Sequence, residues 1–472
     1  MTQASSFVQP TVIQHAQVLL PSGEIVPREV MLSGGSIAAI GTQLEVPEGT
    51  QVIDGSGCTL LPGVIDAHVH LREPGLEHKE DLLSATCACA KGGVTSFLEM
   101  PNTLPLTTTQ AVLTDKLAIA AAKSLVNYGF FISVTAENLD DLRTAEPACG
   151  IEVFVDSEVS FEAGSKMNAE ASSEASLEAS SKAIGRSINT IEALAPIFAT
   201  GDRLIAVHAE NQARTFARRQ QFAGETAPET HTKIQDSEVA LSATRQVLSL
   251  SKQYQRRLHI LQVSTAEEAN LLRGDKPSWV SAEVTPHHLL LDISAYKKLG
   301  TLAQTNPPLR YPRDREILWQ ALKDGVIDFV ASDHAPHTLD EKAKGYLNAP
   351  SGLPGVETAL PLMLTQTMEN RATVAEVANW MSTAVARAYN IPNKGLIEPG
   401  FDADLVLVDL STYRPVLREE LLTKCGWSPF EGWNLTGWPV VTIVGGQVVY
   451  DRGRINTQVR GKALQFGKMM VL

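Results

Sequence analysis

Residues 64–72, VIDAHVHLR, form the stretch that decides the fold. The stretch is typical of an apolar strand that ends in two histidines, His68 and His70. Side chains two residues apart on a strand point to one face, so both imidazoles can bind the same cation. Two histidines at this spacing arise by chance in many proteins. Here they close an apolar strand and precede LREPG (71–75), which makes the pattern a strong indication of a metal site.

Seven further apolar stretches follow, and helix-like segments lie between most of them. They are VTSFLEMP (94–101), YGFFISVT (128–135), GIEVFVDS (150–157), RLIAVHAE (203–210), RLHILQVST (257–265), VSAEVTPHHL (280–289) and IDFVASDH (327–334). Eight buried strands interleaved with helices predict an α/β fold, a closed parallel (β/α)8 barrel of the TIM type. A doubly wound open sheet is the alternative, which is weakened because no glycine-rich phosphate loop follows the first strand.

The two ends of the chain have a different character. Short apolar strands with PSG and SGG turns fill residues 11–60, and ADLVLVDL, PVVTIVGG and QVVYDRG give the C-terminal part the same pattern. We therefore expect a small composite β-sandwich from residues 1–62 and 392–472, and the barrel from residues 63–391. Residues 164–187 are rich in Ser, Ala and Glu, which predicts a flexible, solvated insertion rather than a lid over the site.

The composition predicts a protein of the cytoplasm. A net charge of −13 argues against nucleic acid and anionic membranes as partners, because binding to these needs basic surfaces. The five cysteines fit no zinc ribbon, so a reduced protein is expected. The N-terminal stretch MTQASSFVQP lacks a secretory pattern, and no run of about 18 apolar residues could span a bilayer.

A carboxylate and a third imidazole stand at two other strand ends. Asp333 lies in ASDHAPH (331–337), which closes the eighth strand, where a carboxylate can ligate a metal and accept a proton. Capping of a helix is the structural alternative for Asp333. His208 ends the fifth strand and becomes a candidate ligand because the other two histidines exist. His259 is expected to face away from Gln262, three residues further along its strand.

Long stretches of the chain resemble the dihydroorotases, a family of cyclic amide hydrolases. They are PGVIDAHVHLREPGLEHKEDLLSATCACAKGGVTSFLEMPNTLP, NPPLR, SDHAPHT, SGLPGVETALPLML, GLIEPGFDADLVLVDL and WSPFEGW. The resemblance covers nearly the whole chain, is weakest over residues 152–190, and is especially close to cyanobacterial members. It implies metal-dependent, reversible hydrolysis of (S)-dihydroorotate to N-carbamoyl-L-aspartate in pyrimidine biosynthesis, by a homo-oligomer.

The resemblance also implies roles for individual residues. Members of the family use two divalent metal ions, usually zinc. His68, His70 and Asp333 are expected to hold the more buried ion, with Asp333 also moving the proton, and His208 belongs to the second ion. Arg72 and Asn102 match residues that hold the substrate carboxylate, for which arginine offers a planar fork. Further substrate contacts are expected from Asn306, His337, Ser351 and Gly352.

Two metal-ligand positions depart from the family pattern. Most members carry a lysine on the fourth strand whose carbamate bridges the two ions, and this chain has Glu152 there. Asp156, four residues on and on the same strand face, matches an aspartate that other members use, so both are candidates for the bridge. On the sixth strand Gln262 replaces a histidine, and a neutral amide oxygen is a poor zinc ligand. We therefore expect one firmly bound zinc ion and a weak or absent second one.

Two other functions fit part of this pattern. A hydantoinase- or allantoinase-type cyclic amidase would share the metal ligands, but a hydantoin has no ring carboxylate for Arg72 and Asn102 to hold. A catalytically weakened subunit that partners aspartate transcarbamoylase would tolerate Glu152 and Gln262, yet the intact HxHxR and SDHAPH stretches argue against it. The dihydroorotase reaction is therefore the expected function.

Overall fold

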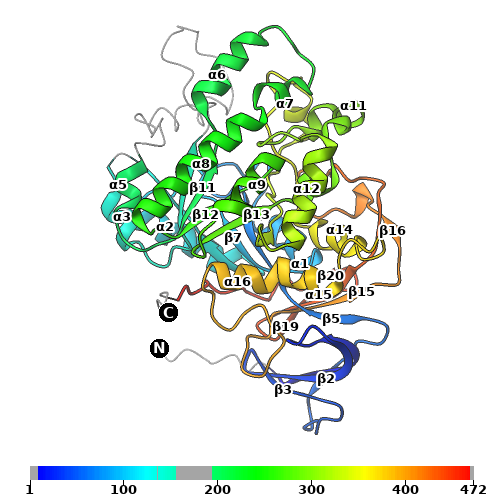
Figure 1. Cartoon of the computed structure of the whole chain (residues 1–472). Coiled ribbons are helices and arrows are strands. Elements are labelled where there is room, and N and C mark those ends of the chain that lie inside the picture. The colour runs from blue at the N-terminus through cyan, green and yellow to red at the C-terminus, as the bar shows by residue number, and fades with distance from the viewer. Residues whose placement is uncertain (1–8, 136, 156–193, 468–472) are drawn as a thin grey trace.

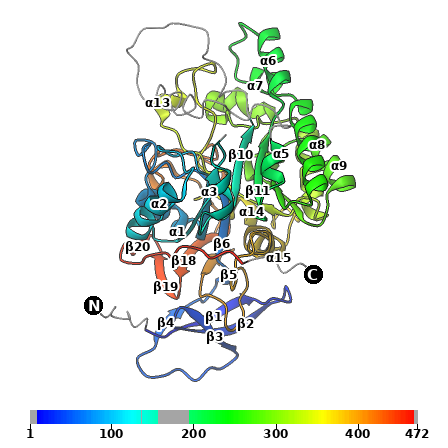
Figure 2. The same ribbon diagram turned by 90° about the vertical axis from the view of Figure 1, so that its left-hand side faces the viewer.

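The computed structural model describes residues 9–135, 137–155 and 194–467. Its largest part is a (β/α)8 barrel, and a β-sandwich module lies below the barrel in both views (Figures 1 and 2). The predicted insertion at residues 164–187 lies outside the described residues, and so does the candidate bridge Asp156.

Eight parallel strands form the wall of the barrel. They are β6 (Val64–Val69), β7 (Val94–Glu99), β8 (Asn127–Phe130), β10 (Ile151–Val155), β11 (Ile205–Ala209), β12 (Leu258–Ile260), β13 (Val280–Val284) and β14 (Phe329–Val330), and the short β9 (Ile132–Ser133) continues β8 and pairs with β10. The first and last strands meet through a parallel bridge between Val69 and His334, and the His70 amide donates to the His334 carbonyl at 2.8 Å. The predicted closed barrel is therefore confirmed.

One predicted strand is wrong at its C-terminal end. The seventh strand was predicted as residues 280–289, but β13 ends at Val284 and the helix α10 (Pro286–Leu290) follows. The Thr285 side chain accepts a hydrogen bond from the His288 amide, and Pro286 occupies the first turn, where a missing N–H is tolerated. The apolar run HHLL therefore belongs to a capped helix.

Helices cover the outside of the barrel (Figure 1). The longer ones are α1 (Leu82–Lys91), α2 (Gln110–Lys123), α6 (Gln212–Gln221), α8 (Ser237–Tyr254), α9 (Ala266–Asp275) and α12 (Pro312–Lys323). The shorter ones are α3 (Leu139–Thr144), α5 (Ala195–Phe198), α7 (Thr230–Ile234), α11 (Tyr296–Leu299), α13 (Leu339–Lys342), α14 (Ala359–Thr365), α15 (Val374–Ala378), the π-helix η5 (Asn379–Thr383) and α16 (Ala384–Ala388). A capping box formed by Thr265 and Glu268 begins α9.

A β-bulge in β6 decides which of its side chains face the site. Ile65 and Ala67 pack in the apolar cluster of the barrel interior, so strict alternation would bring Val69 inside as well. The pairing with β7 instead shifts by one residue just before Val69, and Val69 packs with the apolar side chains of the surrounding helices. The bulge therefore turns both His68 and His70 toward the site at the strand end.

The N- and C-terminal segments build the module together. Its nine strands are β1 (Thr11–Leu19), β2 (Ile25–Ser33), β3 (Ser36–Gly41), β4 (Gln51–Asp54), β5 (Thr59–Pro62), β15 (Leu405–Asp409), β18 (Trp438–Val444), β19 (Gln447–Asp451) and β20 (Arg454–Ile455). β5 and β15 pair antiparallel, with Pro62 opposite Leu405, which joins the two ends of the chain. The predicted composite module is confirmed, and its limits at residues 62 and 392 stay predictions.

Asp404 connects the module to the barrel. One of its carboxylate oxygens accepts from the Gly445 amide at 2.7 Å in the module, and the other accepts from Asn127 Nδ2 at 2.9 Å on β8. Lys394 pairs with the same carboxylate. Asp404 and Asn127 are both buried, so the hydrogen bond between them is protected from water.

We expect Asp404→Ala to lower the free energy of unfolding by about 2–4 kcal/mol, because it leaves the buried Asn127 amide and the partly buried Lys394 ammonium group with fewer partners. Urea unfolding followed by circular dichroism measures this change. The control is Asp451→Ala, which removes an exposed carboxylate paired with the adjacent Arg452 and should cost less than about 0.5 kcal/mol. Equal stability of the two variants would contradict the connecting role of Asp404.

Candidate metal centre

Three side chains from the first and last barrel strands form a group that can hold a metal ion. His68 Nε2 lies 3.4 Å and His70 Nε2 lies 3.3 Å from Asp333 Oδ1. Within residues 9–135, 137–155 and 194–467 this is the one such group of three or more histidine, cysteine or carboxylate ligands. Two nitrogens and one carboxylate oxygen are a donor set that suits zinc and similar divalent cations.

The outer faces of both imidazoles are held by oxygen atoms. His68 Nδ1 lies 2.6 Å from Glu283 Oε1, and His70 Nδ1 lies 2.9 Å from Asn102 Oδ1. An oxygen acceptor at Nδ1 fixes the proton there, so the Nε2 lone pair of each ring is available to a cation. The residues therefore fit a bound metal ion in both donor type and tautomer. Glu283 also holds His259 Nε2 at 3.0 Å, which makes His259 a support of the centre rather than a ligand.

The charges in the centre are strongly coupled. Burial alone would lower the pKa of His68, but the Glu283 and Asp333 carboxylates raise it to about 9. Burial alone would raise the pKa of Asp333, but His68 and His70 lower it to about 2. Burial lowers the pKa of His70 below its usual value. Asp333 is therefore an ionised ligand at neutral pH, and His68 binds a proton in the absence of a cation.

Three residues of the site have backbone conformations that side chains other than glycine rarely adopt. Arg72 has φ of 69°, Gln262 has φ of 52° and Asp333 has φ of 48°. Such left-handed conformations cost on the order of 1–3 kcal/mol each and persist where the surrounding structure enforces them. All three residues follow the regular part of a barrel strand, at the end of the barrel where the metal centre lies.

Gln262 connects the metal centre to His208. Its Oε1 accepts from His208 Nδ1 at 2.8 Å, and its Nε2 donates to Asp333 Oδ2 at 2.5 Å. Nε2 also donates to the Asn306 carbonyl at 3.1 Å. The amide oxygen is therefore directed at an imidazole N–H, not at a cation. His208 is buried next to the centre but is not part of the group of three ligands.

Of the two candidate bridging residues, Glu152 and Asp156, the structure describes Glu152. It is buried on β10 and lies outside the group of three ligands. Burial raises its pKa to about 7, against the opposing effects of His68 and of a hydrogen bond from Ser133. Its carboxyl group is therefore part of the electrostatic environment of His68.

Arg72 and His337 lie together on one side of the centre. Arg72 Nη2 is 3.2 Å from His337 Nε2, and Arg72 Nε donates to the Pro336 carbonyl at 3.2 Å. His337 Nε2 is also 3.1 Å from the carbonyl of Ser351. The next residue, Gly352, has φ of 131°, and a Cβ there would lie 3.1 Å from His337 Nε2. Four of the predicted substrate-binding residues therefore lie together.

Of the other two predicted substrate-binding residues, Asn102 contacts a ligand of the metal centre and Asn306 contacts Gln262. Asn102 holds His70, as described above, and the Asn306 carbonyl holds Gln262. Asn306 Oδ1 also lies 2.6 Å from His231 Nε2. The substrate contacts assigned to all six residues by resemblance stay predictions.

Two buried glutamates at this end of the barrel were missed by the sequence analysis. Glu283 is described above. Glu99 Oε1 accepts from the Leu71 amide at 3.0 Å, between His70 and Arg72, and its Oε2 pairs with Lys116 at 3.1 Å. A glutamate inside an otherwise apolar strand is the signal that could have identified both, because a buried charge must have a partner.

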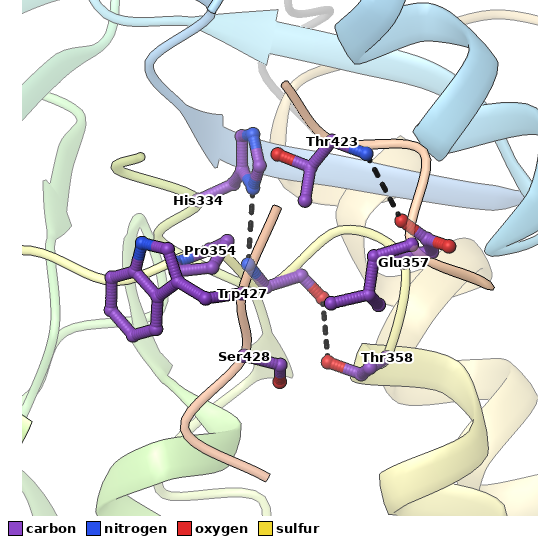
Figure 3. A pocket seen from close by; sticks show the side chains of 9 residues that line it. His334, Pro354, Glu357, Thr358, Thr423, Trp427 and Ser428 are labelled. Atoms are coloured by element: carbon purple, nitrogen blue, oxygen red, sulfur yellow. Dashed lines mark hydrogen bonds between the residues drawn. The ribbon is translucent and has the colours of Figure 1, made fainter. Parts of the chain in front are cut away.

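The cavity in Figure 3 is separate from the metal centre. It measures about 10 Å³ and is lined by residues that include His334, Glu357 and Trp427. His334 Nδ1 accepts from the Gly355 amide at 3.0 Å, and its Nε2 lies 3.8 Å from Glu80 Oε2. The space holds about one water molecule, which excludes it as a substrate site.

No helix in the described part of the chain is long and apolar enough to cross a membrane.

We expect the affinity for a divalent cation to fall as the pH is lowered from 9 to 6. A cation must displace the proton of His68, whose pKa is about 9, so affinity should fall about tenfold per pH unit from this proton alone. Competition with a chromophoric chelator measures it. Glu283→Gln removes the carboxylate that raises the pKa of His68 and should weaken binding at pH 9 while flattening the pH dependence. Affinity independent of pH in the unmodified chain would contradict the assignment.

Comparisons with known proteins identify the family. Residues 59–449 match the amidohydrolase family. The chain is 34% identical over 451 residues to a dihydroorotase of Methanosarcina acetivorans, covering 93% of this chain and 92% of the relative. It is 35% identical over 450 residues to a dihydroorotase of Geobacillus thermodenitrificans, covering 92% and 97%. An L-hydantoinase structure from Arthrobacter aurescens is 26% identical with a TM-score of 0.81, over 94% of this chain and 97% of that one. The chain therefore belongs to the dihydroorotases of the amidohydrolase family.

Proposed function

We propose that this chain catalyses the reversible hydrolysis of (S)-dihydroorotate to N-carbamoyl-L-aspartate. The observation that carries this proposal is the pair Arg72 and His337 beside the ligands His68, His70 and Asp333. A ring amide that reacts at the metal centre can then have its carboxylate held at a fixed distance from the reacting carbonyl. Orientation of this kind removes much of the entropic barrier to hydrolysis.

His68, His70 and Asp333 would hold one zinc ion. A zinc ion supplies Lewis acidity, which polarises an amide carbonyl and lowers the pKa of water. Asp333 is suited to carry the proton, because it is buried, ionised and within 3.4 Å of both imidazoles. In hydrolysis it accepts a proton from the attacking water and returns it to the ring nitrogen as the amide bond breaks.

Substrate specificity would depend on Arg72, Asn102 and His337. The Arg72 guanidinium remains charged in spite of burial, which lowers its pKa only to about 10. A buried cation favours a ligand that brings a negative charge, and dihydroorotate carries a carboxylate that a hydantoin lacks. This charge requirement favours the dihydroorotase reaction over that of a hydantoinase.

A single firmly bound zinc ion is part of the proposal. Gln262 uses both ends of its amide within the protein, so it could ligate a second ion near His208 only by giving up at least one of these hydrogen bonds. The expected cytoplasmic location, the homo-oligomeric state and an association with aspartate transcarbamoylase stay predictions.

Cyclisation of N-carbamoyl aspartate by the purified protein, with zinc counted in the same sample, tests the function. We expect turnover at about one zinc ion per chain, loss of turnover with a chelator and recovery on adding zinc. Gln262→His should raise the zinc content toward two, and His208→Ala in that background should return it to one. Two tightly bound ions in the unmodified chain would contradict the single-ion proposal. No turnover of the zinc-loaded protein would contradict the function and favour a non-catalytic subunit.

We expect Arg72→Lys to raise KM for dihydroorotate about 10- to 100-fold, because a point charge replaces a planar fork. Steady-state kinetics in both directions measures the effect on each substrate. Arg143→Lys, an exposed position on α3, is the matched control and should leave KM unchanged. An unchanged KM in Arg72→Lys would show that another group holds the carboxylate.

A further inference from the structure

Lys79 lies behind His337, on the side away from Arg72. Its Nζ is 3.1 Å from His337 Nδ1 and 3.1 Å from Glu341 Oε1. Lys79 belongs to the loop between β6 and α1, and Glu341 belongs to α13, so two separate elements meet at this ring. Lys79 and His337 are both buried. The contact between Lys79 and His337 therefore belongs to the buried site and is not a surface interaction.

The contact with Lys79 decides which nitrogen of His337 bears the proton. An ammonium group has three donors and no acceptor, so His337 Nδ1 must accept. The proton of the neutral ring then lies on Nε2, which donates to the Ser351 carbonyl at 3.1 Å. A second ring proton would point at the ammonium group. Burial and the neighbouring Arg72 and Lys79 cations accordingly hold the pKa of His337 well below its usual value.

Two donors therefore face each other across 3.2 Å, since Arg72 Nη2 can only donate and His337 Nε2 also carries hydrogen. Their separation is not a hydrogen bond in this tautomer. It is the spacing at which one incoming oxygen can accept from Arg72 and share the single Nε2 hydrogen with the Ser351 carbonyl in a three-centre hydrogen bond. A carboxylate oxygen fits best, because hydrogen bonds to an ionised acceptor are the stronger ones.

We propose that Lys79 is a positioning residue that sets the tautomer of His337, so that His337 and Arg72 together recognise a ring carboxylate. The identity of that ring rests on the proposed function, whereas the tautomer does not. Lys79 does not touch the substrate in this proposal. It acts through His337 alone.

Removal of the ammonium group should reverse the tautomer. In the parent chain, Glu341 Oε2 lies 3.8 Å from His337 Nδ1. In Lys79→Met this carboxylate is the charged group left beside that nitrogen. A carboxylate only accepts, so it draws the ring proton to Nδ1 and leaves Nε2 bare. Arg72 Nη2 then donates to Nε2, and the site loses one donor and turns a lone pair toward the incoming carboxylate.

The experiment combines kinetics with nitrogen NMR of the full zinc-loaded chain. In ¹⁵N-histidine-labelled protein, with His337→Gln used to assign the signal, we expect His337 to be protonated at Nε2 in the parent chain and at Nδ1 in Lys79→Met. KM for dihydroorotate and for N-carbamoyl aspartate should rise about tenfold or more, with kcat within about threefold. Lys276→Met, which breaks a pair with Asp328 at 2.6 Å at the opposite end of the barrel, should leave KM and the spectrum unchanged.

A second variant separates tautomer control from simple loss of packing. Lys79→Met with Glu341→Gln replaces the competing carboxylate by an amide that can donate to Nδ1, so KM should recover in part and the Nε2 proton should return. An Nδ1-protonated or doubly protonated His337 in the parent chain would overturn the proposal. So would a rise in KM with an unchanged spectrum. If the parent chain fails to turn over dihydroorotate, the proposed function fails, and the spectra still decide the tautomer.

Discussion

Closure of the barrel between β6 and β14 is the contact on which the site depends. The His70 amide donates to the His334 carbonyl, and the Ser332 amide donates to Asp66 Oδ1 at 3.0 Å. These bonds bring together ligands that lie more than 260 residues apart in the sequence. Because all parallel strands of the barrel end at the same rim, the residues that follow each strand lie close together at that rim. The bulge in β6 and the left-handed backbone at Asp333 then set which side chains point into it.

Buried glutamates at the rim of the barrel hold the metal ligands and the adjacent backbone in position. Glu283 supports His68 and His259, and Glu99 fixes the backbone between His70 and Arg72. Removing one member of such a pair would leave an uncompensated charge in a dry environment, which costs more than an exposed pair contributes. The ligands are thus held by groups whose own positions are fixed. This arrangement limits the reorganisation needed when a cation or a substrate binds.

The sequence predicted the barrel and the composite module well, and the site in part. Eight apolar stretches and two β-rich ends carry strong periodic signals, and HxH at a strand end is specific. The hydrophobic pattern alone could not show that HHLL (287–290) belongs to a capped helix, since a short apolar run fits a strand as well as a helix. The donor and acceptor directions of Gln262 and His337 depend on neighbours from other loops, helices and strands, so the local sequence pattern could not predict them. Glu152 and Asp156 stay the two predicted bridges, and Asp156 lies outside the described residues.

The charge of the site bears on how many cations it needs. A second divalent ion commonly serves to neutralise a cluster of carboxylates. Here Glu283 lies 2.6 Å from His68 Nδ1 and 3.0 Å from His259 Nε2, and Asp333 faces His68 and His70 and accepts from the Gln262 amide. Burial raises the pKa of Glu152 to about 7, so that carboxyl can be neutral near physiological pH without any ion. Gln262 joins His208 to Asp333 by hydrogen bonds, and this connection supports the proposal of a single firmly bound zinc ion.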